Sequence, residues 1–248
     1  MRNSTDFEEI LEAHFPKSVR LESYIDSSRA ALSNSGFNAE NTLACVCACR
    51  DELTRCFGRR VEEVWGEAFD LSGLGGLFFA GATGLGAAMH HGPQVDGKER
   101  YVFYLLAHIG LGADGSYGVC TRPGRSGESS ACGALCAFSE QWFSGKLNLE
   151  MDPDDLEQSL LRQRLARELS EDARPNLKEL TKLAHDAAAS DLKRLLERLV
   201  DTSVTDYALL TGVHIHGPDQ NDYIWPQECF SVVEGDLSPL VLSDFARS

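Results

Sequence analysis

The segment 101–108, YVFYLLAH, limits the possible folds of this chain more than any other. It is apolar almost throughout, and such a run is typical of a strand that is covered on both faces. A sheet whose strands are covered on both faces carries helices on each side. We therefore expect an α/β fold built around residues 101–108.

Further apolar runs predict strands, and segments with three-to-four spacing or mixed charge predict helices. The expected strands cover residues 41–49, 76–80, 207–215 and 228–233. The expected helices cover residues 6–33, 51–65, 131–143 and 153–200, the last interrupted at Pro175. This alternation indicates a mostly parallel central sheet flanked by helices.

Two composition signals refine this outline. Residues 153–200 mix acids and bases, which predicts a largely solvated helical pair. Glycine-rich residues 81–86 and the Gly- and Ser-rich residues 110–130 predict loops. We expect residues 1–40 to form an N-terminal helical arm, and residues 41–248 to form a single α/β domain with a helical insertion at about 150–200.

The formal net charge of −15 makes nucleic acids and anionic membranes poor partners. The longest apolar stretch, residues 71–89, is interrupted by glycines and predicts no membrane span. The N-terminal residues carry early acids and lack the apolar core of a signal peptide. The sequence therefore predicts a soluble protein with no evident targeting segment.

The eight cysteines do not form the framework of a small disulfide-stapled domain. Cys45, Cys47 and Cys49 alternate within one apolar run, so they are expected on the same face of a strand. We expect most of the cysteines to be reduced, with a few available to bind a metal.

Three side chains of types that can bind a metal lie at the ends of predicted elements. Cys49 ends one strand, His108 ends another, and Cys132 opens a helix after a glycine- and serine-rich loop. Ligands gather at the carboxyl ends of parallel strands, and two thiolates with one imidazole suit a zinc ion that keeps an open position. The alternative is that these cysteines are small buried apolar residues, and spacing alone does not exclude it.

Acidic and basic residues follow Cys49 directly. Asp51 lies at the start of a predicted helix, and Arg55 lies four residues later on the same helical face. Beside a zinc ion, such a pair would orient a reacting water and keep the carboxylate ionised. An ordinary surface ion pair explains the same spacing equally well.

His214 and His216 share one face of the late strand. A pair of this kind can bind a metal. No cysteine or further histidine lies close to them in the sequence, so a structural role is favoured.

Four segments together resemble the limiting-CO2-inducible protein B family, which is similar to beta-class carbonic anhydrases and is sometimes called the theta class. They are CACRDE (47–52), GATGLGAAMHHGP (81–93), YLLAHIG (104–110) and SGESSACGAL (126–135). The resemblance covers roughly residues 40–235 and implies a beta-carbonic-anhydrase-like fold.

The resemblance also implies a ligand set. Cys49 and Cys132 match the two cysteines of the beta-class pattern, and His108 is placed as the histidine, with residues 110–130 inserted after it. Residues 41–248 would then be a zinc-binding domain that holds Zn2+ through these three side chains.

The family pattern also contains an aspartate and an arginine. Asp51 matches the aspartate, but the arginine position falls on Leu53, which cannot do the same work. Arg55 is the first substitute and Arg50 the second, so the resemblance implies Asp51, Arg55 and Arg50 as candidate catalytic residues.

The implied activity is zinc-dependent reversible hydration of CO2 to bicarbonate and a proton. The alternative is a catalytically silent relative that keeps the zinc and acts in CO2 or bicarbonate sensing, or in assembly. The resemblance further implies a homodimer, located in the cytoplasm of a bacterium or in the chloroplast stroma of an alga.

Overall fold

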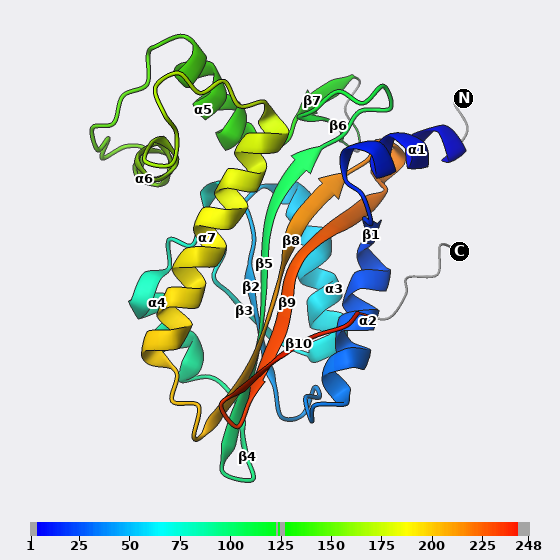
Figure 1. The fold of residues 1–248 in the computed structure, drawn as a ribbon, viewed down its shortest axis with the longest axis vertical. Helices are drawn as coiled ribbons and strands as arrows, with labels where there is room; N and C mark the ends of the chain where they lie inside the picture. The colour runs from blue at the N-terminus through cyan, green and yellow to red at the C-terminus, as the bar shows by residue number, and fades with distance from the viewer. Residues whose placement is uncertain (1–3, 123, 125–126, 243–248) are drawn as a thin grey trace.

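A computed structural model describes residues 4–122, 124 and 127–242. Its centre is an eight-stranded sheet with the strand order β1-β9-β8-β5-β2-β3, to which β10 and β4 add at β9 and β5 (Figure 1). The strands are β1 (Val19–Arg20), β2 (Leu43–Cys47), β3 (Ala68–Asp70), β4 (Gln94–Val95), β5 (Lys98–Gly110), β8 (Thr205–His216), β9 (Asp222–Val233) and β10 (Asp236–Pro239).

Strands β3, β2, β5 and β8 run parallel to one another, whereas β9 pairs antiparallel with β8. Strand β5 lies in the middle and is buried from Tyr101 to Gly110, as the apolar run predicts. In its pairing with β8, His108 lies opposite His214. The predicted α/β fold with a mostly parallel central sheet is confirmed.

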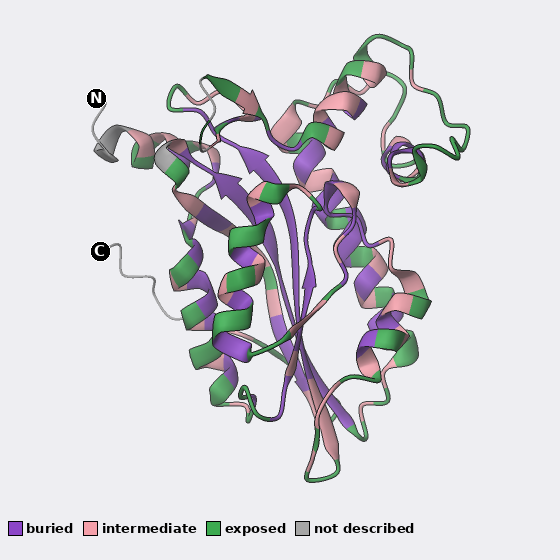
Figure 2. Ribbon diagram, turned by 180° about the vertical axis from the view of Figure 1, so that it is seen from behind, coloured by how far each residue is buried: buried purple, intermediate pink, exposed green. Residues whose placement is uncertain are grey.

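Helices cover both faces of the sheet (Figure 1). The helices α2 (Leu21–Ser33) and α3 (Arg55–Trp65) lie on one face, and α4 (Gly81–Met89) and α7 (Leu177–Leu199) lie on the other. Alternate residues of β5 divide between two cores: Phe103 and Leu105 pack on the α7 side, and Tyr104 and Leu106 pack on the α2 and α3 side. Figure 2 shows the resulting buried strands between helices that expose their outer surfaces.

The remaining helices lie near one end of the sheet. They are α1 (Ser4–His14), α5 (Gly133–Phe143) and α6 (Leu156–Ala166). A short hairpin of β6 (Val119–Thr121) and β7 (Glu128–Ser130) forms within the segment expected to be a loop. Among the described residues, no helix is long and apolar enough to cross a membrane.

The prediction of a largely solvated helical pair at 153–200 is wrong for α7. This helix buries residues along its full length, among them Leu180, Ala184, Ala188 and Leu192. The spacing of four residues keeps these small and apolar side chains on one face, toward the sheet. Charged residues occupy the other face. Because they are numerous, the composition of the segment alone does not reveal the row of buried residues.

The predicted strand at 76–80 is also absent, and residues 81–86 form part of helix α4 instead of a loop. A short 3-10 turn, Leu74–Gly76, approaches β5 closely at this point. A Cβ atom on Gly76 would lie 2.8 Å from the carbonyl oxygen of Leu106, so the close approach requires glycine. The parallel edge strand is β3, whose three residues lack a clear apolar signal.

Candidate metal centre

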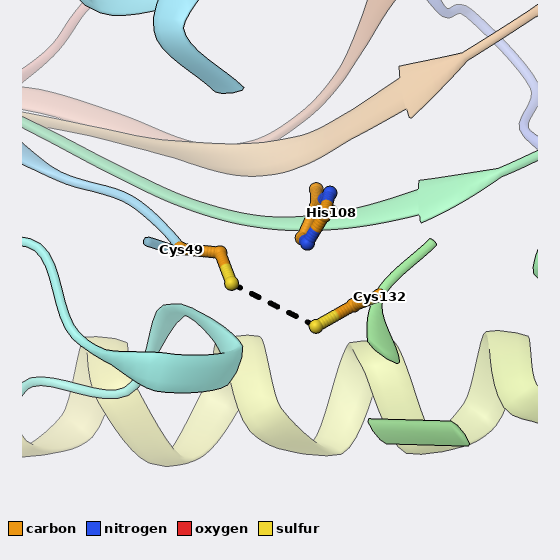
Figure 3. A group of neighbouring side chains, drawn as sticks. All are labelled: Cys49, His108 and Cys132. Atoms are coloured by element: carbon orange, nitrogen blue, oxygen red, sulfur yellow. Dashed lines mark hydrogen bonds between the residues drawn. The ribbon is translucent and has the colours of Figure 1, made fainter. Parts of the chain in front are cut away.

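The three predicted metal ligands converge at the carboxyl end of the parallel strands (Figure 3). Cys49 follows β2 by two residues, His108 lies near the end of β5, and Cys132 is the N-cap residue of α5. The backbone N–H of Gly110 donates to the carbonyl of Ala131 at 3.1 Å, which holds Cys132 beside the end of β5. Segments far apart in the sequence therefore meet at one point.

The separation of the two sulfurs suits a tetrahedral ion. The Sγ atoms of Cys49 and Cys132 lie 3.7 Å apart, and one ligand atom from each of the three residues lies within 4.8 Å of the others. Two thiolates at about 2.3 Å from a tetrahedral zinc would lie about 3.8 Å apart. All three side chains are buried, so the cluster is shielded from bulk water.

The imidazole of His108 has one nitrogen without a partner. Its Nε2 atom is fully buried, and it neither donates nor accepts a hydrogen bond within the described part of the chain. A buried polar atom without a partner costs free energy, and its presence in a native site requires an explanation. A metal ion bound between this nitrogen and the two sulfurs would satisfy it, so the donor set fits a divalent metal such as zinc.

The two thiols share one proton unequally. The hydrogen bond from the Cys132 thiol lowers the pKa of Cys49 to about 4, although burial opposes this shift. The same interaction with Cys49, reinforced by burial, raises the pKa of Cys132 well above its usual value. The pair is thus a thiolate and a thiol at neutral pH, and one sulfur is already in the form that binds metals.

Asp51 lies on the solvent side of this cluster. Its Oδ1 atom accepts from the backbone N–H of Leu53 at 3.1 Å, which caps the short helical turn Glu52–Thr54. Its Oδ2 atom lies 3.9 Å from Nε2 of His108. Burial raises the pKa of Asp51, and a nearby cation would favour the ionised form of its carboxyl group.

That cation is Arg122, which lies just beyond β6. Its Nη2 atom lies 3.4 Å from Oδ1 of Asp51, and its other nitrogens donate to Glu52, to the Ser129 hydroxyl and to the carbonyl of Ser130. The Nη1 atom also lies 3.3 Å from Sγ of Cys120 on β6, so the guanidinium contacts both strands of the β6–β7 hairpin while it faces Asp51. The predicted loop between His108 and Cys132 therefore supplies a positively charged side chain to the site.

Among the described residues, the arginine in ion-pair contact with Asp51 is Arg122, not Arg55 or Arg50, which the sequence suggests. Nε of Arg50 lies 3.0 Å from Glu157 Oε1 on α6, and its side chain is more than half exposed. Arg55 is exposed on the first turn of α3. Both arginines line a cavity of about 380 Å³ that reaches Cys49 and Asp51 from outside.

The other ring nitrogen of His108 contacts a second group of polar side chains. Its Nδ1 atom lies 2.9 Å from Nε2 of His216, and Nδ1 of His216 lies 2.7 Å from Oδ1 of Asp222. The same carboxylate oxygen lies 2.9 Å from Nε2 of His214. Burial lowers the pKa of His216 to about 3, so its ring is neutral at physiological pH. His216 thus contacts a candidate ligand directly, whereas His214 contacts Asp222.

Sequence reasoning found neither Arg122 nor Asp222. Arg122 lies in an irregular segment 71 residues from Asp51, where no periodicity connects the two. Asp222 opens β9 as the register partner of His216, and only correct pairing of two antiparallel strands would reveal it. A charged residue at the start of a strand that pairs with the end of the preceding strand is the signal that would have suggested Asp222.

Comparison with known proteins identifies the family. The family model of limiting CO2-inducible proteins B/C beta carbonic anhydrases matches residues 18–234. The crystal structure of the limiting CO2-inducible protein LCIB shares 32% sequence identity and a TM-score of 0.79, and the match covers 98% of this chain and 100% of that chain. No curated protein in the comparison matches significantly.

A further crystal structure supports the fold. That of PtLCIB4, a homolog of LCIB, has a TM-score of 0.82 at 24% identity, with 94% of this chain and 99% of that chain covered. The family model spans most of the chain, including the segments that carry Cys49, His108 and Cys132. This chain belongs to the family of limiting CO2-inducible proteins B/C, described as beta carbonic anhydrases.

Proposed function

We propose that this protein is a zinc-dependent carbonic anhydrase that interconverts CO2 and bicarbonate. The observation that carries the proposal is the buried, unpartnered Nε2 atom of His108 beside two sulfurs 3.7 Å apart. Family membership supports the choice of reaction, since the matching family is described as beta carbonic anhydrases. Cys49, His108 and Cys132 are the proposed zinc ligands.

Two thiolates and one imidazole would leave one of four tetrahedral positions open, which is typical of catalytic rather than structural zinc. The chemistry that zinc supplies when bound is the activation of water as a nucleophile at neutral pH. Cys49 is already ionised at that pH, so it presents a thiolate to the metal without losing a proton. The cavity that reaches Cys49 and Asp51 offers a path for CO2 and bicarbonate.

Asp51 and Arg122 would orient the reacting water. Oδ2 of Asp51 is positioned to accept a hydrogen bond from that water, and Arg122 would keep the carboxylate charged by its contact with Oδ1. A carboxylate fixed by an arginine loses little orientational freedom when it meets substrate. Arg122 would thus take the role that the family resemblance left open at Leu53.

The decisive experiment measures CO2 hydration by stopped flow and zinc content on the same sample. We expect zinc at about one per chain, as a single three-ligand site requires. The variants Cys49→Ala and Cys132→Ala are expected to lose zinc and activity together. Zinc retained at that level in either variant would show that the ligand assignment is wrong.

The silent-relative alternative gives a different result in the same experiment. It predicts zinc at about one per chain, as for one such site, with a hydration rate equal to that of buffer. The variant Cys45→Ala is a matched control, because Cys45 is a buried cysteine of β2 that lies outside the cluster. It is expected to retain both zinc and activity.

A further inference from the structure

A chain of hydrogen-bonding groups runs from the proposed metal site into the sheet. It connects His108 on β5, His216 at the end of β8 and Asp222 at the start of β9, with contacts of 2.9 Å and 2.7 Å. Both imidazoles are buried, with side-chain exposures of 0% and 5%, so water does not compete for these contacts. This series of hydrogen-bonded groups is therefore a fixed part of the fold.

The chemistry of the groups decides which nitrogen carries each proton. Several contacts hold the pKa of Asp222 below its usual range: burial opposes this, but hydrogen bonds from His214 and His216 outweigh it. An ionised carboxylate only accepts hydrogen bonds, so Nδ1 of His216 must carry a proton. When both rings are neutral, this leaves a lone pair on Nε2 of His216, which lies 2.9 Å from Nδ1 of His108 and accepts its proton in a hydrogen bond.

The consequence falls on the other nitrogen of His108. A neutral imidazole with its proton on Nδ1 has a lone pair on Nε2, the atom that is buried without a partner beside Cys49 and Cys132. We propose that Asp222, acting through His216, sets the tautomer of His108 so that Nε2 faces the two sulfurs as a metal-binding lone pair. His216 and Asp222 are thus positioning residues rather than catalytic residues.

His214 strengthens the anchoring of Asp222. Its Nε2 atom donates to the same Oδ1 atom that His216 contacts, and the Cys56 thiol donates to Oδ2 at 3.4 Å. Donors thus reach both oxygens of the carboxylate, so its orientation toward His216 is fixed. Partners that fix the second nitrogen of a metal-binding histidine typically contribute 10- to 100-fold in metal affinity.

The metal-affinity part of this inference rests on the proposed zinc site, whereas the tautomer part does not. The first measurement is therefore a 1H–15N correlation spectrum of the imidazole nitrogens in the metal-free protein, with His108 assigned from the variant His108→Ala. We expect the proton of His108 on Nδ1 and that of His216 on Nδ1. A proton on Nε2 of His108 in the unmodified protein would overturn the proposal without any mutation of the network.

The second measurement is zinc affinity, by competition with a chromophoric chelator, for Asp222→Asn and His216→Phe. We expect a mixture of His108 tautomers and an affinity loss of about 10- to 100-fold. Unchanged affinity and an unchanged tautomer in both variants would refute the positioning role. Because neither readout is an activity, the inference can stand even if the protein does not hydrate CO2.

Asp206→Asn is the matched control. Asp206 is also a buried carboxylate of the β8 and β9 region, but it lies at the opposite end of β8, where it contacts Lys98 at 3.3 Å and Arg100 at 3.6 Å. This variant loses a buried ion pair and is expected to have a lower melting temperature with unchanged zinc affinity. An equal loss of zinc affinity in Asp206→Asn would show that general destabilisation causes the loss, and it would overturn the proposal.

Discussion

At the residue scale, the Asp51 carboxylate is in contact with a charged side chain that lies next to a distant hairpin. Burial works against its ionisation, and Arg122 is the cation that reaches it, at 3.4 Å. Arg122 is itself held by Glu52 and by the hairpin. Its removal would therefore leave the carboxylate partly buried without a fixed counter-ion.

Arg122→Ala is expected to lower kcat/KM for CO2 hydration by about 10- to 100-fold while zinc remains bound, as for other groups that orient residues at a metal site. Stopped-flow assays with metal analysis would measure both quantities. Arg55→Ala is the matched comparison, because Arg55 is the arginine that sequence spacing suggests. A larger loss in Arg55→Ala than in Arg122→Ala would contradict the assignment.

The shared proton of Cys49 and Cys132 gives a second residue-scale prediction. Two ordinary thiols would release nearly two protons when zinc binds at pH 7.5. Because the pKa of Cys49 is lowered to about 4, only Cys132 should release a proton, and we expect about one. Calorimetric titration with zinc in buffers of different ionisation enthalpy would count the protons. A release of two would contradict the thiolate–thiol pair.

The convergence of Cys49, His108 and Cys132 could be anticipated from sequence for a physical reason. Parallel strands end at the same edge of a sheet, so residues at their ends are brought together even when they are far apart in the chain. Arg122 lies in an irregular connection, and no periodic rule predicts where such a side chain reaches. The strand ends therefore suggested the candidate ligands and the family resemblance selected them, whereas neither suggested Arg122 as the partner of Asp51.

At the element scale, α7 is the helix that covers most of one face of the sheet. It begins with a capping box, in which the Asn176 side chain accepts from the backbone of Glu179 at 3.0 Å and the Glu179 side chain accepts from the backbone of Asn176 at 2.7 Å. Both contacts satisfy N–H groups that have no partner within the helix. The start of α7 is thus fixed by local chemistry.

Asn176→Ala is expected to reduce the free energy of unfolding by about 1 kcal/mol, because it removes the side-chain acceptor at the N-cap. Urea denaturation followed by circular dichroism would measure the change. Asn176→Asp keeps an acceptor at the same position and should retain nearly all of the stability. Equal destabilisation by both substitutions would show that the cap is not the cause.

The elements differ in how well sequence predicts them. The sequence predicts strand β5 because its residues are apolar on both faces, and α1 because of its helical spacing. Helix α4 was missed because GATGLG is rich in glycine, and only packing against α7 and the core stabilises a helix of such residues. The short strand β3 was missed because its backbone pairing with β2 defines it, not its side chains.

At the scale of the whole molecule, the proposed metal site joins three parts of the fold. Cys49 follows β2, His108 belongs to the central strand β5, and Cys132 begins α5. An unfolded chain holds these residues far apart and offers no assembled site. Zinc that binds only the native state would therefore add its binding free energy to the stability of the entire domain.

Zinc at about 1,000 times its dissociation constant would add about 4 kcal/mol to the free energy of unfolding. For a chain of this length, that corresponds to a rise in melting temperature on the order of 10 °C. Differential scanning calorimetry of zinc-loaded and chelator-treated protein would measure the shift. Cys132→Ala should abolish the shift because it removes one of the two sulfurs. Cys45→Ala should preserve it, since burial raises the pKa of Cys45 and this cysteine remains a thiol within the core. If the zinc-dependent shift persists in Cys132→Ala but disappears in Cys45→Ala, the metal binds in the interior of the sheet and not at its end.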